Sequence, residues 1–227
     1  MGGLHDGHGE LIRRAAAHGP VLVSVFVNPL QFGPAEDFDR YPRSLKTDLT
    51  LADRCGAAAL WAPSVQMIYP DGACSSHHAA DGLQQHLCGA GRPGHFDGVV
   101  TVVARLLDLV RPANLWLGEK DWQQLVILRR LVADLCIPVK VQGVATLREA
   151  DGLAISSRNQ YLTSAERHQA ATLPAALRAA DATTPLEITR SRLSAAGLEV
   201  EYVERVDPIT LQPCGSETAI SLLAATG

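Results

Sequence analysis

Hydrophobic positions in the first two thirds of the chain alternate between helix-like and strand-like spacing. Residues 9–18 carry apolar side chains at the spacing of a helix. Val21–Val27 is an apolar run of strand length without alternation, which is typical of a strand buried on both faces. A helix at Ser44–Cys55 and a strand at Ala58–Trp61 repeat this order. Helices and strands that alternate in this way favour an α/β fold with a parallel sheet.

A second helix-and-strand unit follows the polar segment 71–98, which we interpret as a long ordered loop. Val99–Val110 is apolar on almost every side, which predicts a deeply buried helix, and a strand at Asn114–Leu117 comes next. We expect Asp121 to cap a further helix and Val139–Val144 to form the strand after it. Together these elements predict a doubly wound parallel sheet.

The pattern changes after the second unit and divides the chain into two predicted domains. Residues 1–146 are expected to form a Rossmann-like nucleotide-binding domain. Residues 147–227 are expected to form a small C-terminal α+β lid domain. The lid is predicted from a helix at Ser164–Ala180, a second helix after Pro185 and an alternating strand at Glu199–Val206.

Charge and composition exclude several classes of partner. Twenty Lys and Arg residues against 24 Asp and Glu residues give a net charge of −4, so no overall basic field attracts nucleic acid or an anionic membrane. The longest apolar run is only a strand long, and the N-terminal residues have no signal-peptide pattern. The five cysteines include no CxxC pair. We therefore expect a cytoplasmic protein that holds anionic ligands in a local site.

Three donor-rich segments are candidates for that site. His5 and His8 lie beside a helix start in a glycine-rich segment, where free backbone N–H groups favour phosphate. Lys120 follows a strand and is expected at the carboxyl edge of the sheet, where ligands bind in such folds. Residues 155–159 place two hydroxyls, a guanidinium and an amide in succession, which suits phosphate oxygens. The alternatives are a tail with chance histidines, a solvated turn lysine and an ordinary polar turn.

Two glutamines are candidates for holding a small acid. Gln31 and Asn28 follow the first buried strand and are expected near the histidines, and Gln124 lies one turn into the helix after Lys120. A solvated glutamine is the plain alternative for each.

Other polar clusters are assigned no chemistry. The loop residues His77, His78, His86, Cys88 and His95 match no zinc spacing, and Glu36, Asp37 and Asp39 are interpreted as an acidic surface loop beside Arg40 and Arg43.

Five motifs in sequence order resemble pantothenate synthetase, the pantoate and β-alanine ligase family of the nucleotidylyltransferase superfamily. They are MGGLHDGH (1–8), VFVNPLQFGPAEDFDRYPR (25–43), GRPGHFDGVVTVV (91–103), GEKDWQQL (118–125) and READGLAISSRNQYL (148–162). The resemblance implies a homodimer that uses ATP and Mg²⁺. Pantoate would attack ATP to give pantoyl adenylate and pyrophosphate, and β-alanine would then displace AMP.

The resemblance also implies roles for particular residues. His5, His8, Lys120 and Arg158 would act in catalysis. Gln31 and Gln124, with Asn28, would hold pantoate. The nucleotide would be held by residues from three segments: Met1, Gly2, Gly3, Leu4, His5, Asp6, Gly7 and His8; Gly118, Glu119, Lys120 and Asp121; and Leu147, Ile155, Ser156, Ser157 and Arg158.

The chain also departs from the family pattern. Family members carry a strand and a Pro-Thr pair before the Met-Gly of the histidine motif, so we expect the sheet to lack its central first strand and Val21–Val27 to lose a neighbour. The C-terminal SLLAATG is expected to stop short of the last strand, which would leave the lid incomplete. Two other functions remain open: a nucleotidyl transferase without an acyl intermediate, and a weak or inactive homologue that binds nucleotide.

Overall fold

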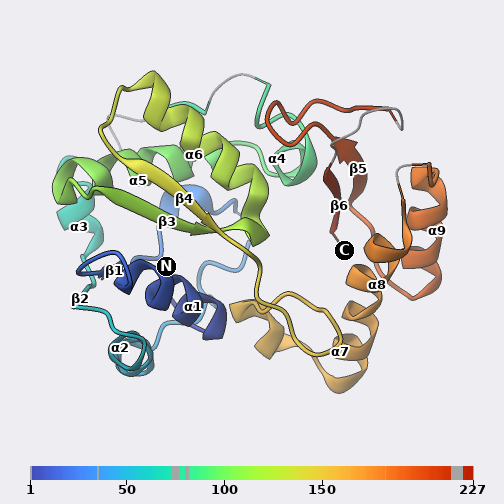
Figure 1. Cartoon of the computed structure of the whole chain (residues 1–227), viewed down its shortest axis with the longest axis horizontal. Coiled ribbons are helices and arrows are strands. Elements are labelled where there is room, and N and C mark those ends of the chain that lie inside the picture. Colours follow the sequence, from blue (N-terminus) through green and yellow to red (C-terminus); the bar gives the residue numbers. More distant parts are fainter. Residues whose placement is uncertain are drawn as a thin grey trace.

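The structure is a computed structural model that describes the chain except for residues 1, 35, 73–76, 80–81, 182, 216–221 and 227. Figure 1 shows the arrangement of its elements. In chain order they are α1 (Asp6–Ala16), β1 (Leu22–Ser24), η1 (Pro29–Gln31), α2 (Leu45–Arg54), β2 (Ala59–Trp61), α3 (Val65–Ile68), α4 (Leu87–Gly91), α5 (His95–Val110), β3 (Asn114–Gly118), η2 (Glu119–Asp121), α6 (Trp122–Asp134), β4 (Lys140–Val144), η3 (Ser157–Tyr161), α7 (Ser164–Ala170), α8 (Thr172–Ala179), α9 (Leu186–Ala195), β5 (Tyr202–Val206) and β6 (Leu222–Thr226).

Parallel strands joined through helices confirm the predicted α/β class. β1 pairs with β2, with Leu22 opposite Ala59, and β3 pairs with β4, with Asn114 opposite Lys140. Helix α6 packs on β3 and β4, whereas α1 packs on β3 and lies on the other side of this pair in Figure 1. Among the described residues no strand joins the two pairs.

Several elements differ in length from their predictions. β1 is shorter than the predicted strand at Val21–Val27, because its partner β2 pairs with it over only three residues, Leu22 to Ser24. The predicted helix at Ser164–Ala180 is two helices, α7 and α8. Pro174 lies in the first turn of α8 and has no N–H to donate to the turn before it, so one continuous helix cannot form. The strand β6 was not predicted, and it pairs antiparallel with β5.

The main core lies between α5 and α6, as the apolar pattern of α5 predicts. Phe96 and Val100 of α5 pack with Ile127 and Leu128 of α6, and all four side chains are almost fully buried. A second cluster joins α1, β1 and α2, and it includes Ile12. The two clusters fix the carboxyl ends of the strands and the start of α1 relative to one another.

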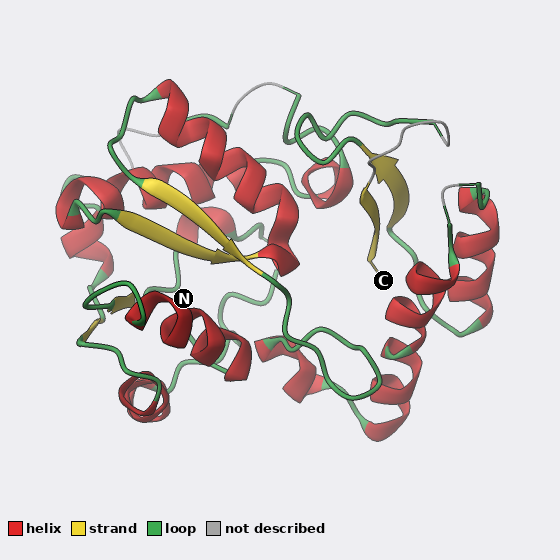
Figure 2. Cartoon of the chain, viewed as in Figure 1, coloured by secondary structure: helices red, strands yellow, loops and turns green. Residues whose placement is uncertain are grey.

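β5 belongs to the predicted C-terminal domain and also contacts the N-terminal one. Val203 packs against Leu193 of α9, whereas Val206 packs with Leu87 of α4 and Val126 of α6. Figure 2 shows the β5–β6 pair between α4 and the helices α8 and α9. The C-terminal part is therefore docked on the N-terminal part through a strand as well as joined to it by the chain.

Within the described part of the chain, no helix has the length and apolar character needed to cross a membrane.

Candidate active site

Two histidines form the first turn of α1. His5 is the N-cap residue, and its Nδ1 accepts a hydrogen bond from the Gly7 backbone N–H at 3.2 Å. His8 lies in the third helical position, and its Nδ1 accepts from the His5 backbone N–H at 3.2 Å. The two ring centroids are 4.0 Å apart. Because both Nδ1 atoms are acceptors, each neutral ring carries its proton on Nε2, which leaves two N–H donors beside a helix N-terminus.

Burial and positive charge keep both imidazoles neutral. Burial lowers the pKa of His8 to about 3, with a further contribution from the His5 ring. Burial also lowers the pKa of His5, followed by the positive charge of Lys120. Lys120 acts on the His8 pKa as well, so its ammonium lies within electrostatic reach of both rings. The structure thus brings the two rings together, with the positive charge of Lys120 within electrostatic reach, and the roles of the three side chains in a site stay predictions.

A buried carboxylate, which sequence reasoning missed, holds the histidine segment in place. Asp48 of α2 is 1% exposed, and its two oxygens accept hydrogen bonds from the backbone N–H of Leu4 at 2.7 Å and of Gly3 at 3.2 Å. Gly3 has a φ of +60°, and an added Cβ would lie 2.8 Å from the Cβ of Pro42. The sequence signal for Asp48 was a single acid on the apolar face of a predicted helix.

The turn after β3 brings Lys120 to the carboxyl edge of the strand pair, as predicted. Lys120 Nζ lies 3.1 Å from an Asp121 carboxylate oxygen. Asp121 occupies the N-cap position of α6, as predicted, but within the described chain its side chain makes no capping hydrogen bond. Residues 119–121 instead form a 3₁₀ turn that leads directly into the helix, so the first turn of α6 is preceded by helical backbone.

Asn28 is buried and supports Gln31. Its amide nitrogen donates to the backbone oxygen of Gly98 at 3.0 Å and to Gln31 Oε1 at 3.3 Å. Its amide oxygen accepts from the Tyr69 hydroxyl at 2.9 Å and from the Leu30 backbone N–H at 3.2 Å. Only 2% of Asn28 is exposed. The structure thus places Asn28 behind Gln31, which is half-buried, as the residue that orients it.

Neighbouring glutamines on α6 have different surroundings. Gln124 is half-buried. Gln123, which sequence reasoning missed, is buried, and its amide nitrogen donates to the backbone oxygens of Leu83 and His86 at 2.8 Å each. Its amide oxygen accepts from the Cys88 thiol at 3.1 Å. Gln123 therefore fixes the loop that begins α4.

The described residues contain no group of three or more His, Cys, Asp and Glu side chains arranged to hold a metal ion. Burial raises the pKa of the Cys88 thiol, which keeps it protonated.

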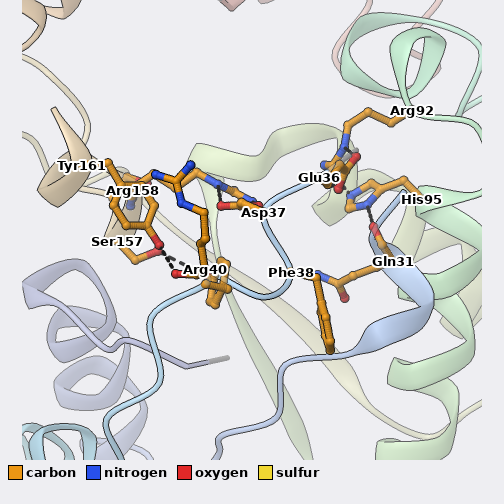
Figure 3. Close-up of polar contacts among 12 residues, drawn as sticks. Gln31, Glu36, Asp37, Phe38, Arg40, Arg92, His95, Ser157, Arg158 and Tyr161 are labelled. Atoms are coloured by element: carbon orange, nitrogen blue, oxygen red, sulfur yellow. Dashed lines mark hydrogen bonds and ion pairs between the residues drawn. The ribbon is translucent and has the colours of Figure 1, made fainter. Parts of the chain in front are cut away.

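Arg158 is held by a different partner from the histidine group. Its Nε and Nη2 donate to the Asp37 carboxylate at 2.9 and 2.7 Å (Figure 3). Its guanidinium lies over the Tyr41 ring, 5.4 Å from the centroid. The Tyr41 hydroxyl lies 3.3 Å from Ser157 Oγ. Pro42 follows Tyr41 and lies against the Gly3 backbone, so the same segment reaches the histidine motif. The guanidinium itself was predicted to join the histidines, but its described contacts are with this segment.

The rest of the predicted nucleotide loop is ordered by its own backbone. Ile155 donates its backbone N–H to the Leu147 oxygen at 3.0 Å. The Ser156 hydroxyl caps η3 by accepting from the Arg158 N–H at 3.3 Å. Leu147 is exposed, and Ser156 and Ser157 are half-buried. Hydroxyls and N–H groups of this loop therefore lie beside Arg158, whereas the predicted Met1 contact lies outside the described residues.

The acidic segment differs from its interpretation as a surface loop paired with nearby arginines. Glu36 binds Arg92 and Asp37 binds Arg158, which are 56 and 121 residues away along the chain. Each arginine holds the pKa of its carboxyl below the usual range, mainly through the hydrogen bonds that it donates. Apart from the two carboxylates themselves, no sequence pattern indicated either pairing.

A separate cavity of about 410 Å³ lies at the amino ends of β3 and β4, the opposite edge from Lys120. Its lining includes Leu107, Arg111, Pro112, Cys136 and Pro138. Parallel α/β sheets bind ligands at the carboxyl edge, so this cavity is not the candidate site.

Comparison with known proteins identifies the family. A family model of pantoate-beta-alanine ligases matches residues 1–227. The bifunctional pantoate ligase/cytidylate kinase of Parasynechococcus marenigrum (strain WH8102) is 81% identical over 227 residues, which are 99% of this chain and 45% of that protein. The chain thus spans about half the length of the curated relatives it matches.

Solved structures agree with the sequence comparison. Pantothenate synthetase from Thermus thermophilus superposes with a TM-score of 0.92 at 43% identity, covering 100% of this chain and 86% of that one. Pantoate-beta-alanine ligase from Francisella tularensis, which was solved with beta-gamma ATP and beta-alanine, has a TM-score of 0.86 at 38% identity, covering 91% of this chain and 79% of that one. The chain therefore belongs to the pantoate-beta-alanine ligase family.

Proposed function

We propose that the chain joins pantoate to β-alanine in a reaction driven by ATP, with pantoyl adenylate as the intermediate. The observation that carries the proposal is the pair of neutral imidazole donors at the start of α1, with the Lys120 ammonium within electrostatic reach of both. Such a set of donors matches the negative charge of a triphosphate. The Francisella ligase in complex with beta-gamma ATP and beta-alanine supports both ligands.

In the first step a pantoate carboxylate oxygen attacks the α-phosphorus of ATP, and the bond to the bridging oxygen of pyrophosphate breaks. Negative charge grows on the departing pyrophosphate, and the Nε2–H groups of His5 and His8 can donate to it. Lys120 supplies a full positive charge. The low pKa of His8 makes it a hydrogen-bond donor rather than a source of a proton near neutral pH.

In the second step the β-alanine amine attacks the acyl carbon of pantoyl adenylate. An amide bond forms, the bond to the phosphate oxygen of AMP breaks, and the amine loses a proton. No covalent bond to the chain is needed, so the side chains contribute position and charge. Gln31 and Gln124 would hold pantoate, and Arg158 with Ser156 and Ser157 would bind phosphate oxygens.

Mg²⁺ would enter with the nucleotide. The two imidazoles and Lys120 are donors, which suit phosphate oxygens, and the nearby carboxylates of Asp6 and Asp121 form no cluster among the described residues that could hold the ion by itself. When bound to ATP, Mg²⁺ supplies charge neutralisation to the phosphates. We also propose a cytoplasmic homodimer, on the family resemblance; molecular mass measured by light scattering tests the dimer.

Replacing Lys120 tests the function and its charge requirement together. On a scale of about 3 kcal/mol for one preorganised donor, Lys120→Ala should lower pantoate-dependent pyrophosphate release about a hundredfold or more. Lys46→Ala removes an exposed lysine of α2 and should leave the rate unchanged. Near-normal pyrophosphate release by Lys120→Ala would remove Lys120 from the site.

The reaction class is tested by the products of the unaltered chain. Release of AMP that depends on β-alanine distinguishes the ligase from a nucleotidyl transferase that forms no acyl intermediate. A chain that binds ATP and pantoate in calorimetry but releases neither pyrophosphate nor AMP would be the inactive homologue instead.

A further inference from the structure

Two consecutive acidic residues hold arginines from distant parts of the chain. The Glu36 carboxylate accepts from Nε and Nη2 of Arg92 at 2.7 and 2.6 Å. The Asp37 carboxylate accepts from Nε and Nη2 of Arg158 at 2.9 and 2.7 Å. Figure 3 shows the two pairs on opposite sides of the segment. A two-point contact fixes the direction of a guanidinium as well as its position.

The Glu36–Arg92 ion pair is connected to Gln31 through His95. Arg92 Nη1 lies 3.0 Å from His95 Nε2, and His95 Nδ1 lies 2.7 Å from the Gln31 backbone oxygen. A guanidinium only donates, so His95 Nε2 accepts, and Nδ1 carries the proton that is donated to Gln31. Burial lowers the pKa of His95, which keeps the ring neutral as this arrangement requires. A continuous chain of hydrogen bonds thus runs from Glu36 to the backbone of Gln31.

The Asp37 pair leaves part of Arg158 for a ligand. The side-on contact uses the Nε–H and one Nη2–H of the five guanidinium donors. The remaining end-on pair on Nη1 and Nη2 has the spacing that two phosphate oxygens need. Tyr41 packs against the same guanidinium and lies 3.3 Å from Ser157 through its hydroxyl. The direction of the end-on pair is therefore set from two sides.

Aromatic packing stiffens the segment that carries both carboxylates. The Phe32 ring lies 5.2 Å from the Phe38 ring and 5.7 Å from the Tyr41 ring. Arg43 donates to the Phe38 backbone oxygen at 2.7 Å and lies over its ring, 4.7 Å from the centroid. In Figure 3 the Phe38 ring lies below the two ion pairs. A segment held in this way can pass orientation to the arginines that it binds.

We propose that Glu36 and Asp37 are positioning residues for two different substrates. Glu36 acts on the pantoate side, through its chain of contacts to Gln31. Asp37 acts on the ATP side, through Arg158. The inference rests on the proposed function, which supplies the two substrates. Each carboxylate acts through an arginine.

The test is a comparison of Michaelis constants in variants of the whole chain. Glu36→Gln should raise KM for pantoate about tenfold and leave KM for ATP unchanged, as for loss of a supporting contact. Asp37→Asn should raise KM for ATP about tenfold and leave KM for pantoate unchanged. An amide has nearly the same size as the carboxylate, but it is uncharged and has only one oxygen to accept the two hydrogen bonds from the guanidinium. A general structural defect would raise both constants together.

Matched variants separate orientation from charge. Asp39→Asn removes an exposed carboxylate from the same segment and should leave both constants unchanged. Arg92→Lys and Arg158→Lys keep the positive charge but lose the two-point contact, so they should reproduce the pantoate and ATP patterns respectively. If either acidic variant fails to fold, as judged by circular dichroism, the corresponding lysine variant decides.

Three results would overturn the inference. The first is an equal rise of both constants in each variant. The second is a change no larger than that of Asp39→Asn. The third is a chain that binds neither ATP nor pantoate in calorimetry, which would overturn the proposed function as well. An active parent chain whose variants show no split between substrates would overturn the positioning roles alone.

Discussion

Backbone hydrogen bonds at the start of α1 decide which nitrogen of each imidazole carries its proton. His5 and His8 both accept through Nδ1, so their Nε2–H groups are the donors available to a ligand. Capping the helix and presenting the donors therefore depend on the same two bonds.

The low pKa of His8 predicts a loss of stability in acid. The unfolded chain binds a proton near the ordinary value of 6.5, whereas the folded chain binds it only near 3. Between these values the free energy of unfolding should fall as the pH falls, by up to about 1.4 kcal/mol per pH unit from this group. Urea denaturation across this range should show a shallower pH slope in His8→Gln. His168→Gln, on the exposed surface of α7, serves as the control, and equal slopes in both variants would contradict the prediction.

At the residue scale, local patterns predicted the donors but not their supports. His5, His8 and Lys120 could be placed together because a helix start and a strand end are visible in the sequence. Asp48 and Gln123 could not, since their hydrogen bonds join residues 34 to 45 positions apart. The direction of Arg158 depends on Asp37, 121 positions away.

At the scale of elements, one glycine allows α5 to approach the turn that carries Gln31. A Cβ on Gly98 would overlap the Leu30 carbonyl group, and it would lie 2.7 Å from the Gln31 nitrogen. The Gly98 oxygen accepts from the Asn28 amide at 3.0 Å, so the helix and the turn are also joined by a hydrogen bond. The close approach is therefore part of how the turn is held.

Gly98→Ala should destabilise the chain, because the new methyl group meets rigid backbone. We expect a loss of about 1–3 kcal/mol in the free energy of unfolding, measured with urea, as for other overpacked sites. Gly91→Ala, in α4, meets no atom within 4 Å and should cost far less. Equal stability of the two variants would contradict the prediction, because it would show that α5 can shift without a loss in the free energy of unfolding.

Element boundaries were predicted where a local signal exists. α2 and α6 follow their apolar patterns, and α9 begins directly after Pro185, as predicted. The length of β1 could not be predicted, because strand pairing depends on a neighbour that local spacing does not reveal. The break between α7 and α8 had a signal in Pro174, which an Ala-rich helical pattern concealed.

At the scale of the whole molecule, the two predicted domains share a hydrophobic cluster. Leu87, Val126, Val206 and Leu211 form it, and the Trp122 indole donates to the Pro208 oxygen at 2.8 Å across the same boundary. The alternation of elements predicted the α/β class, but it could not predict this docking, since the indole and its acceptor are 86 residues apart. Any movement of the C-terminal part relative to the N-terminal part must either preserve this contact or shift the two surfaces along each other.

ATP together with pantoate should close the C-terminal part over the histidine group, with a hinge near Thr146. A reactive adenylate needs protection from water, which gives closure a chemical reason. Limited proteolysis between residues 146 and 163 should slow when both ligands are present, and small-angle scattering should show a more compact particle. ATP alone is the control. Identical cleavage and scattering with and without the two ligands would exclude closure.

Glu36 and Asp37, whose carboxylates hold Arg92 and Arg158, are consecutive residues joined by one rigid, planar peptide group. On the proposed roles, a tilt of this peptide group that improves the contact with one arginine disturbs the contact with the other. Binding of one substrate would then change the affinity for the other without direct contact between them. Linkage requires that pantoate alter the affinity for ATP by the same factor as ATP alters the affinity for pantoate.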